Sequence, residues 1–264
     1  MDILAILAGL GTGFVLGLLG SGGSIIALPA LLYLLHVEPK SAIAMSLGVV
    51  AVTATLAALG HVRRGNVDLK IALVFASFGA LGTFMGTRVG VAIPAAVQLS
   101  AFALVMYAAA WRMQRKPASS PSSPGGRGGS EATPGCEHYF STCMAYIVLA
   151  GIAVGLLTGV VGVGGGFLIV PALVLLSRVP IKQAVATSLA IVSANSSVGF
   201  AGYLGSVPIS WGIMAGFTAV TVVGSFAGAR FSNRLSQETL KRSFAWFLVV
   251  VATYILFKNV IATH

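Results

Sequence analysis

Residues 9–23 read GLGTGFVLGLLGSGG, and residues 151–165 read GIAVGLLTGVVGVGG. The two stretches share six glycines at the same spacing, and each lies in a long apolar run. The register continues without a gap, because positions 9–90 and the positions 142 residues later are identical at 24 of 82 places. Proline, lysine and arginine are among the identities, so chance similarity between apolar segments does not explain them. The chain therefore contains two copies of one unit.

The composition indicates that this chain lies in a lipid membrane and not in water. It is 57% hydrophobic and only 8% charged, whereas soluble domains carry about 25% charged residues. An all-α polytopic membrane protein is therefore expected. The net charge of +10 comes from short basic clusters between apolar runs, so nucleic acid is not an expected partner. The expected membrane segments cover residues 3–35, 43–60, 69–87, 91–111, 145–177, 184–204, 209–229 and 243–261.

Three regions follow from this pattern. Residues 1–113 form the first transmembrane repeat, and residues 141–264 form the second. Residues 114–140 between them are rich in Pro, Ser and Gly, which is typical of a flexible linker. Each repeat is expected to contain a helical hairpin broken at its Gly cluster, followed by three transmembrane helices.

The basic residues predict how the repeats are oriented. If each long opening segment folds back on itself, the repeats are inverted, both termini lie outside and the linker is cytoplasmic. The Lys and Arg residues then divide 13 to 3 in favour of the cytoplasmic side, as membrane proteins require. If each opening segment crosses once, the repeats are parallel and the division is 8 to 8. The sequence therefore favours inverted repeats.

The Gly clusters predict the binding site. A break in a helix within the membrane persists only where it is buried in protein or lines a cavity. It also creates a helix N-terminus, whose free N–H groups attract anions. Pro29 and Pro171 are expected to fix the start of the second half-helix. Predicted anion-binding residues at the breaks are Gly22, Gly23, Ser24, Gly164, Gly165 and Gly166. The glycines spaced four apart, by contrast, predict close helix packing.

The glycine pattern, followed by Pro-Ala-Leu and by Ala-x-Ala-x-Ser-Leu, occurs twice (the second copy of the last motif begins at Ala184). In this respect the chain resembles the sulfite exporter TauE/SafE family of membrane transporters over nearly its whole length outside the linker. The resemblance implies export of small organosulfur anions such as sulfite, sulfoacetate or other sulfonates. The two copies differ at Ser24 against Gly166 and at Met45 against Thr187, which indicates that the breaks are not equivalent.

Other polar residues in the apolar segments are candidates for the same site. Hydroxyl and amide donors suit sulfonate oxygens, and the candidates are Ser46, Thr187, Ser188 and Asn195. Hydrogen bonding between helices is an equally good explanation for them. Arg88 and Arg230 occupy matched positions, where they either attract the anion or extend to the membrane interface.

Several functional classes receive no support from the sequence. The expected membrane segments contain no Asp or Glu and no pair of catalytic side chains. An enzyme, a cofactor and a metal site are therefore not predicted. The predicted function is secondary transport of a small anion across the bacterial cytoplasmic membrane. The alternatives are an anion channel and a transporter of another small organic or inorganic anion. The oligomeric state is left open, with a homo-oligomer among the alternatives.

Overall fold

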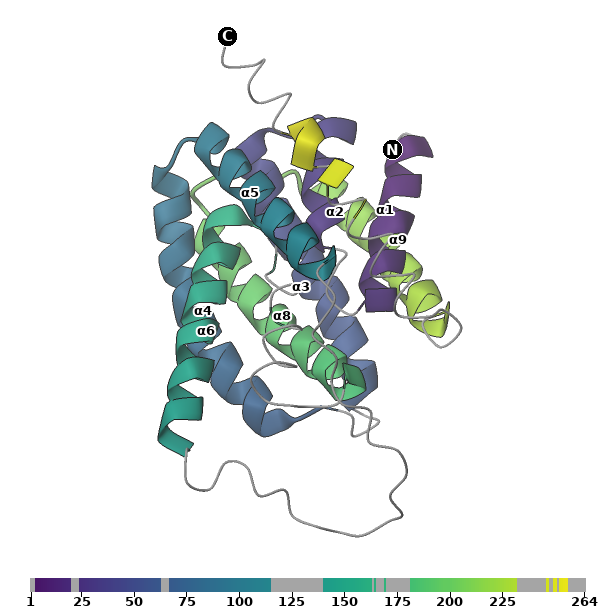
Figure 1. Cartoon of the computed structure of the whole chain (residues 1–264). Helices are drawn as coiled ribbons and strands as arrows, with labels where there is room; N and C mark the ends of the chain where they lie inside the picture. The colour runs from purple at the N-terminus through teal and green to yellow at the C-terminus, as the bar shows by residue number, and fades with distance from the viewer. Residues whose placement is uncertain are drawn as a thin grey trace.

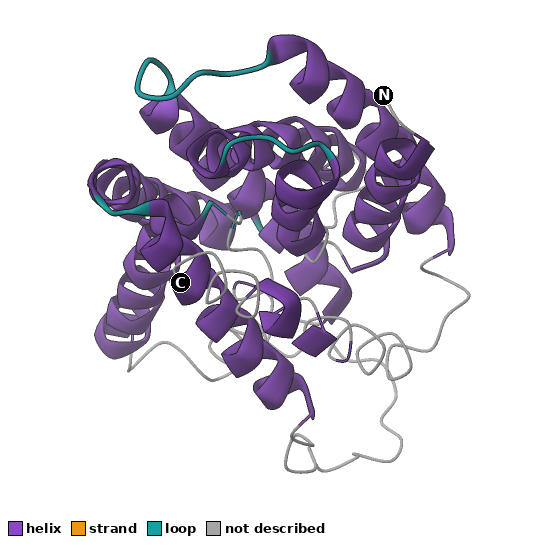
Figure 2. Ribbon diagram, turned by 90° about the horizontal axis from the view of Figure 1, so that it is seen from above, coloured by secondary structure: helices purple, strands orange, loops and turns teal. Residues whose placement is uncertain are grey.

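The described part of the structure is a bundle of helices. The structure is a computed structural model that describes residues 3–19, 24–62, 67–114, 140–162, 164, 169, 181–231, 246, 249–250 and 252–255. These residues form helices and connecting loops with no strand among them (Figures 1 and 2). The elements are α1 (Ile3–Leu19), α2 (Ser24–Pro29), the π-helix η1 (Ala30–Leu34), α3 (Pro39–Val62), α4 (Leu69–Ala92), α5 (Ala95–Gln114), α6 (Phe140–Val161), α8 (Ile181–Tyr203) and α9 (Trp211–Phe231).

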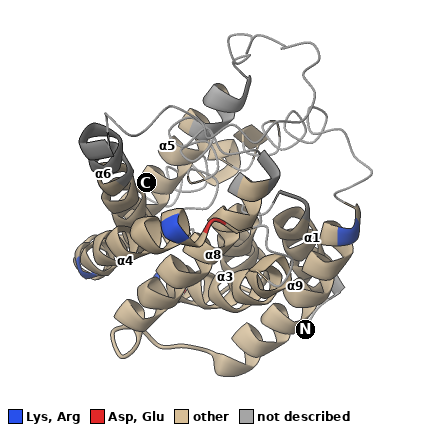
Figure 3. Ribbon diagram, turned by 90° about the horizontal axis from the view of Figure 1, so that it is seen from below, with Lys and Arg blue, Asp and Glu red and all other residues tan. Residues whose placement is uncertain are grey.

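Four described helices are long and apolar enough to cross a membrane, namely α3, α4, α9 and residues 185–203 of α8. The surface of the bundle is also apolar. On α4, for example, Leu73 is 67% exposed and Met85 is 62% exposed. Trp111 and Trp211 are exposed near helix ends, where membrane proteins place their aromatic belts. Figure 3 shows that the charged residues visible from below also lie at helix ends. The all-helical membrane fold is therefore confirmed.

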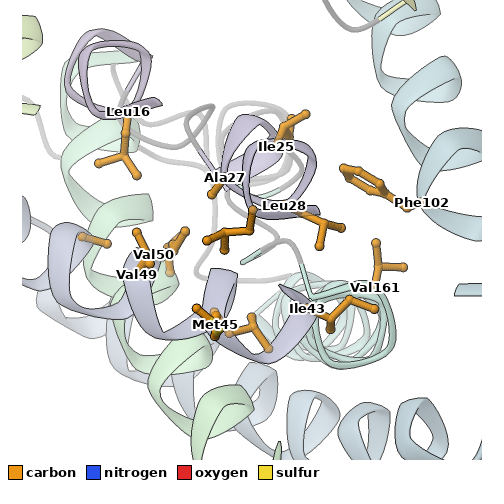
Figure 4. Packing of buried hydrophobic residues seen from close by; sticks show 14 of the residues in the cluster. Leu16, Ile25, Ala27, Leu28, Ile43, Met45, Val49, Val50, Phe102 and Val161 are labelled. Carbon is orange, nitrogen blue, oxygen red and sulfur yellow. The ribbon is translucent and has the colours of Figure 1, made fainter. Parts of the chain in front are cut away.

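The opening segment of the first repeat folds back on itself. Both α2 and η1 contact α1, and the side chains of α2 lie between Leu16 of α1, Val50 of α3 and Phe102 of α5 (Figure 4). The second arm has 6 residues in α2 and 5 in η1. At about 1.5 Å per residue it spans roughly 16 Å, about half of a membrane core. This arm is therefore too short to cross a membrane alone.

The prediction that Pro29 fixes the start of the second half-helix was wrong. The helix begins at Ser24, and Pro29 is its sixth residue. Proline has no N–H to donate to the preceding turn. The backbone widens directly after it into η1, in which the N–H of Leu35 donates to the carbonyl of Ala30 at 3.2 Å. Pro29 thus marks a change of helix type.

The predicted boundary between the segments 69–87 and 91–111 was also wrong. Helix α4 continues to Ala92, and α5 begins only at Ala95. Ile93 has an extended backbone, with φ −81° and ψ 143°, as a residue before proline prefers. Pro94 therefore separates the two helices, a signal that a hydropathy profile does not contain.

The first helix of each repeat packs against a helix of the other repeat. Helices α1 and α6 are equivalent by the 142-residue offset, and so are α4 and α9. Helix α1 packs on α9, and α6 packs on α4. A methyl group at Gly13 would meet the carbonyl oxygen of Thr221, and one at Gly155 would meet that of Gly79, which is the equivalent position. The same pair of contacts is therefore made twice.

Glycine makes this packing close. The matched pairs continue along the helices, since Gly17 approaches Ser225 and Gly159 approaches the equivalent Thr83. In each case a Cβ atom would collide with a backbone atom of the facing helix. The prediction that the glycines spaced four apart serve close helix packing is confirmed for Gly13, Gly17, Gly82, Gly86, Gly155 and Gly159. At Gly9 the nearest atom to an added Cβ is a side-chain carbon of Val220, and at Gly151 the contacts are of ordinary length.

Helices α3 and α8, which are also equivalent, cross at the centre of the bundle (Figure 1). The hydroxyls of Thr55 and Ser193 are 2.6 Å apart, and a Cβ at Gly48 would contact Phe200. Residue numbers rise along one helix as they fall along the other, so α3 and α8 run antiparallel. In this register Thr53 and Asn195 lie at the same level along the two helices, and these two positions are equivalent by the repeat offset.

Gly11 and Gly13 provide a matched test of the packing. Gly13→Ala should lower the melting temperature in detergent, because the added methyl would meet backbone atoms of Thr221 and Ser225. Overpacking of this kind costs about 1–3 kcal/mol. Gly11→Ala, with nothing within 4 Å of its added methyl, should leave the melting temperature equal or higher, because alanine favours helix. Equal melting temperatures for the two variants would contradict the close approach of α1 and α9.

Candidate functional site

The break in the second repeat begins where α6 ends. The N–H of Gly162 donates to the carbonyl of Thr158 at 2.8 Å, which is the last bond of the helix that the described residues show. Gly162 has φ +75° and Gly164 has φ +56°, a left-handed backbone that favours glycine. A Cβ at Gly162 would also meet the side chain of Ile43 and lie 3.1 Å from its carbonyl oxygen. The glycine at position 162 is therefore required by both conformation and space.

Three carbonyl groups at this break are bound by side chains from three other helices. The Tyr203 hydroxyl of α8 donates to the carbonyl of Gly159 at 2.9 Å. The Gln98 amide of α5 donates to the carbonyl of Val160 at 2.9 Å. The Ser46 hydroxyl of α3 is 2.6 Å from the carbonyl of Gly162. Unpaired carbonyls in a membrane cost several kcal/mol each, so these donors stabilise the end of α6.

Ser46 connects the two repeats. Its buried hydroxyl lies within hydrogen-bond distance of Gly162 in the second repeat and, at 2.8 Å, of Ile43 in its own helix. The equivalent Ser188 is also buried and donates to the carbonyl of Val185 at 2.8 Å. The position that corresponds to Gly162 in the first repeat, Gly20, lies outside the described residues.

Thr187 lies beside the start of α4. Its hydroxyl oxygen accepts a hydrogen bond from the backbone N–H of Asp68 at 3.1 Å. The Asp68 carboxylate caps α4 by accepting from the N–H groups of Lys70 and Ile71. Thr187 therefore contributes to an interhelical contact at the end of the bundle where α4 and α8 both begin.

Asn195 differs from the other candidates because its side chain is unpaired. The residue is 0% exposed, and neither its Oδ1 nor its Nδ2 atom has a hydrogen-bond partner among the described residues. Its amide lies against Gly79 of α4, where a Cβ would be about 2.5 Å from Nδ2. It lies seven residues beyond Ser188 on α8, roughly 10 Å along the helix axis. Buried polar groups are normally hydrogen-bonded, so this amide requires an explanation.

Arg88 and Arg230 lie on the surface of the bundle. Both residues are exposed, and the Arg88 guanidinium lies 5.2 Å from the centre of the Phe84 ring on the same face of α4. Phe84 is itself 46% exposed. These positions favour extension to the membrane interface, and a role in attracting the anion remains a prediction.

Several predicted site residues lie outside the described part. Gly22, Gly23, Gly165 and Gly166 are outside it, as is the side chain of Ser24, whose backbone begins α2. The candidates with described contacts fall in two places, at the Gly162 break with Ser46 and along α8. The described residues contain no cluster of His, Cys, Asp or Glu suited to a metal ion.

Gln98 and Tyr203 were not predicted from the sequence. Their donors bind carbonyls 62 and 44 residues away in the chain, so no local motif connects them. The sequence did contain one signal for Gln98. It is the one amide residue in the predicted membrane segment 91–111, and its repeat equivalent is Leu240.

A bundle of repeated apolar helices is typical of polytopic membrane proteins, secondary transporters among them, and the comparisons identify the family. The profile of the sulfite exporter TauE/SafE family matches residues 5–255, and the chain belongs to this family. It is similar to a probable membrane transporter protein of Xylella fastidiosa, with 32% identity over 94% of this chain and 92% of that protein. The probable membrane transporter protein YdhB of Bacillus subtilis is 26% identical over 93% of this chain and 96% of its own. No solved structure matches the chain.

Ser46→Ala tests the bond between the repeats. The variant should lower the melting temperature in detergent, because the buried carbonyl of Gly162 loses its donor, at a cost of about 1–3 kcal/mol. Ser77→Ala is the control, since the exposed Ser77 hydroxyl bonds only within its own helix, to Leu73. A loss of stability in both variants alike would contradict a specific role for Ser46.

Proposed function

We propose that this protein is a multi-pass secondary transporter of the bacterial cytoplasmic membrane that exports small organosulfur anions. Sulfite, sulfoacetate and other sulfonates are the proposed substrates. Membership of the TauE/SafE family supports transport, and the printed names of the relatives describe probable membrane transporters. The proposal that the protein is not an enzyme rests on the same similarity.

The observation that carries the proposed binding site is the unpaired Asn195 amide. A buried amide without partners destabilises the folded protein by about 1–3 kcal/mol. Asn195 has this property on α8, where its amide faces Gly79 of α4 in the other repeat. An –NH2 group can donate two hydrogen bonds, and sulfonate oxygens are acceptors. We infer that the anion supplies the missing partner of Nδ2.

The helix breaks are proposed to supply the attraction for negative charge. The first N–H groups of a helix lack intrahelical acceptors and carry a partial positive charge. Helix α2 begins at Ser24, and the next residue, Ile25, is 0% exposed. No Lys or Arg is buried among the residues whose side chains the structure describes, so these helix N-termini are the proposed source of positive charge. Gly22, Gly23 and Ser24 are proposed to bind the anion from the first repeat, and Gly164, Gly165 and Gly166 from the second.

We further propose that the two repeats are inverted across the membrane. The antiparallel course of α3 and α8 supports this orientation. In Figure 1, α1 begins at the top of the bundle, whereas its equivalent α6 begins at the bottom. The Lys40 ammonium at the start of α3 donates to Val91 near the end of α4 at 2.8 Å, so these helix ends share one side. The proposed arrangement has both termini outside and the linker in the cytoplasm.

Cysteine labelling tests the orientation. Arg64 and Ser206 are equivalent positions in the two repeats, and Arg64→Cys and Ser206→Cys would be made in a chain without Cys136 and Cys143. In intact cells a membrane-impermeant maleimide should label Ser206→Cys, and it should label Arg64→Cys only after the membrane is opened. Labelling of both positions from the same side would exclude inverted repeats.

Purified protein in liposomes tests the function. Uptake of radiolabelled sulfite or sulfoacetate should saturate and should be driven by unlabelled anion on the other side, with sulfate and phosphonates as comparisons. Unitary currents would instead indicate a channel.

Asn195→Leu should reduce transport at least tenfold while raising the melting temperature, because it removes an unpaired buried amide. Thr53→Val, at the equivalent position, is the control, because the Thr53 hydroxyl already bonds Val49 at 2.7 Å. Equal transport by Asn195→Leu and wild type would remove Asn195 from the site.

A further inference from the structure

The end of α6 is held by a buried polar cluster, which we define as Gln98, Tyr203 and the carbonyls of Gly90, Gly159 and Val160. The Gln98 amide nitrogen lies 2.9 Å from the carbonyls of both Gly90 and Val160 and 3.4 Å from the Tyr203 hydroxyl. Because that hydroxyl donates to Gly159, it accepts from Gln98. Gln98 is 1% exposed and Tyr203 is 1% exposed. The cluster thus joins α4, α5 and α8 to the last turn of α6.

The orientation of the Gln98 amide follows from its surroundings. Its nitrogen faces two carbonyl oxygens, and a flipped amide would place oxygen against oxygen. Gly90 is part of the arrangement, because a Cβ there would meet the Tyr203 hydroxyl and lie 2.9 Å from the Gln98 nitrogen. Three residues on three helices are therefore mutually adapted to hold two carbonyls just before the break.

The positions that correspond to these residues, and that would serve the first-repeat break, hold different residues. The positions equivalent to Gln98, Gly90 and Tyr203 are Leu240, Ser232 and His61. The glycines of the packing stripes, by contrast, are shared at positions 9, 13 and 17 and at 151, 155 and 159. Leucine has no donor, so position 240 cannot provide the same amide to the first-repeat break. The residues that bind the carbonyls before the second break are therefore among the positions at which the two repeats differ.

We propose that Gln98 and Tyr203 are positioning residues that hold the second-repeat break in one geometry. The proposed anion contact at Gly164, which directly follows this helix end, is then preorganised. A preorganised set of donors binds an anion more tightly than one that must be ordered first. This inference rests on the proposed function in that the bound species is the transported anion.

Gln98→Met and Tyr203→Phe keep the shape of the side chains and remove the donors. In liposomes, each variant should raise the KM for the transported anion at least fivefold, with a maximal rate per inserted molecule within twofold of wild type. A residue that merely supports folding would lower the amount of inserted protein and leave KM unchanged. An unchanged KM in both variants would overturn the positioning role.

A second measurement does not depend on any substrate. Val161, at the end of α6, is 3% exposed, and Val154, two turns earlier, is 8% exposed. In a chain without Cys136 and Cys143, the reaction of Val161→Cys with N-ethylmaleimide should become at least tenfold faster when Gln98→Met is added. Val154→Cys should react at an unchanged rate in the same comparison.

The two measurements separate the failure of one proposal from the failure of the other. If wild-type protein transports none of the tested anions, the proposed function fails, and the labelling comparison still decides whether Gln98 holds the end of α6. Equal labelling of Val161→Cys with and without Gln98→Met would overturn the inference even if transport is observed. Should Gln98→Met not reach the membrane, Tyr203→Phe, which removes only one hydroxyl group, provides the same comparison.

Discussion

A carbonyl group at the end of a helix needs a donor, and an apolar interior contains no bulk water to provide one. Because α6 ends at the break, the carbonyls of Gly159, Val160 and Gly162 lack the N–H donors that a continuing helix would provide. Each of them is bound by a side chain from a different helix, α8, α5 and α3 in turn. The packing of these three helices around the break therefore depends on their hydrogen bonds to the carbonyl groups that the break leaves without intrahelical donors. A rearrangement of the break would require new partners for the same groups.

Close helix packing has a second physical origin, the absence of side chains on the glycine stripes. Without a large hydrophobic driving force between helices in lipid, association depends on van der Waals contact and small residues. Helix α1 contacts α9 and α6 contacts α4 through the same set of equivalent positions. Each repeat therefore completes its packing only with the other repeat, and neither half forms this bundle alone. The anion site proposed between them belongs to both halves.

The repeats are similar in packing and different in polar chemistry. Thr53 is bonded within its helix, whereas its equivalent Asn195 is buried and unpaired. Gln98 and Tyr203 bind carbonyls at the second break, and the equivalent positions hold Leu240 and His61. These polar residues are among the positions at which the described parts of the two repeats differ.

The sequence by itself determined the membrane class, the internal repeat and the packing role of the glycine stripes, because hydropathy and spacing are local properties of the chain. It also predicted a fold-back at the first Gly cluster, and α2 and η1 do contact α1. It misplaced the end of α4, because hydropathy does not register the backbone restriction before Pro94. Only the tertiary structure decided the partners of the broken helix. Ser46 and Gly162 are 116 residues apart, and a hydrogen bond over that distance depends on how the helices pack, which no local pattern encodes.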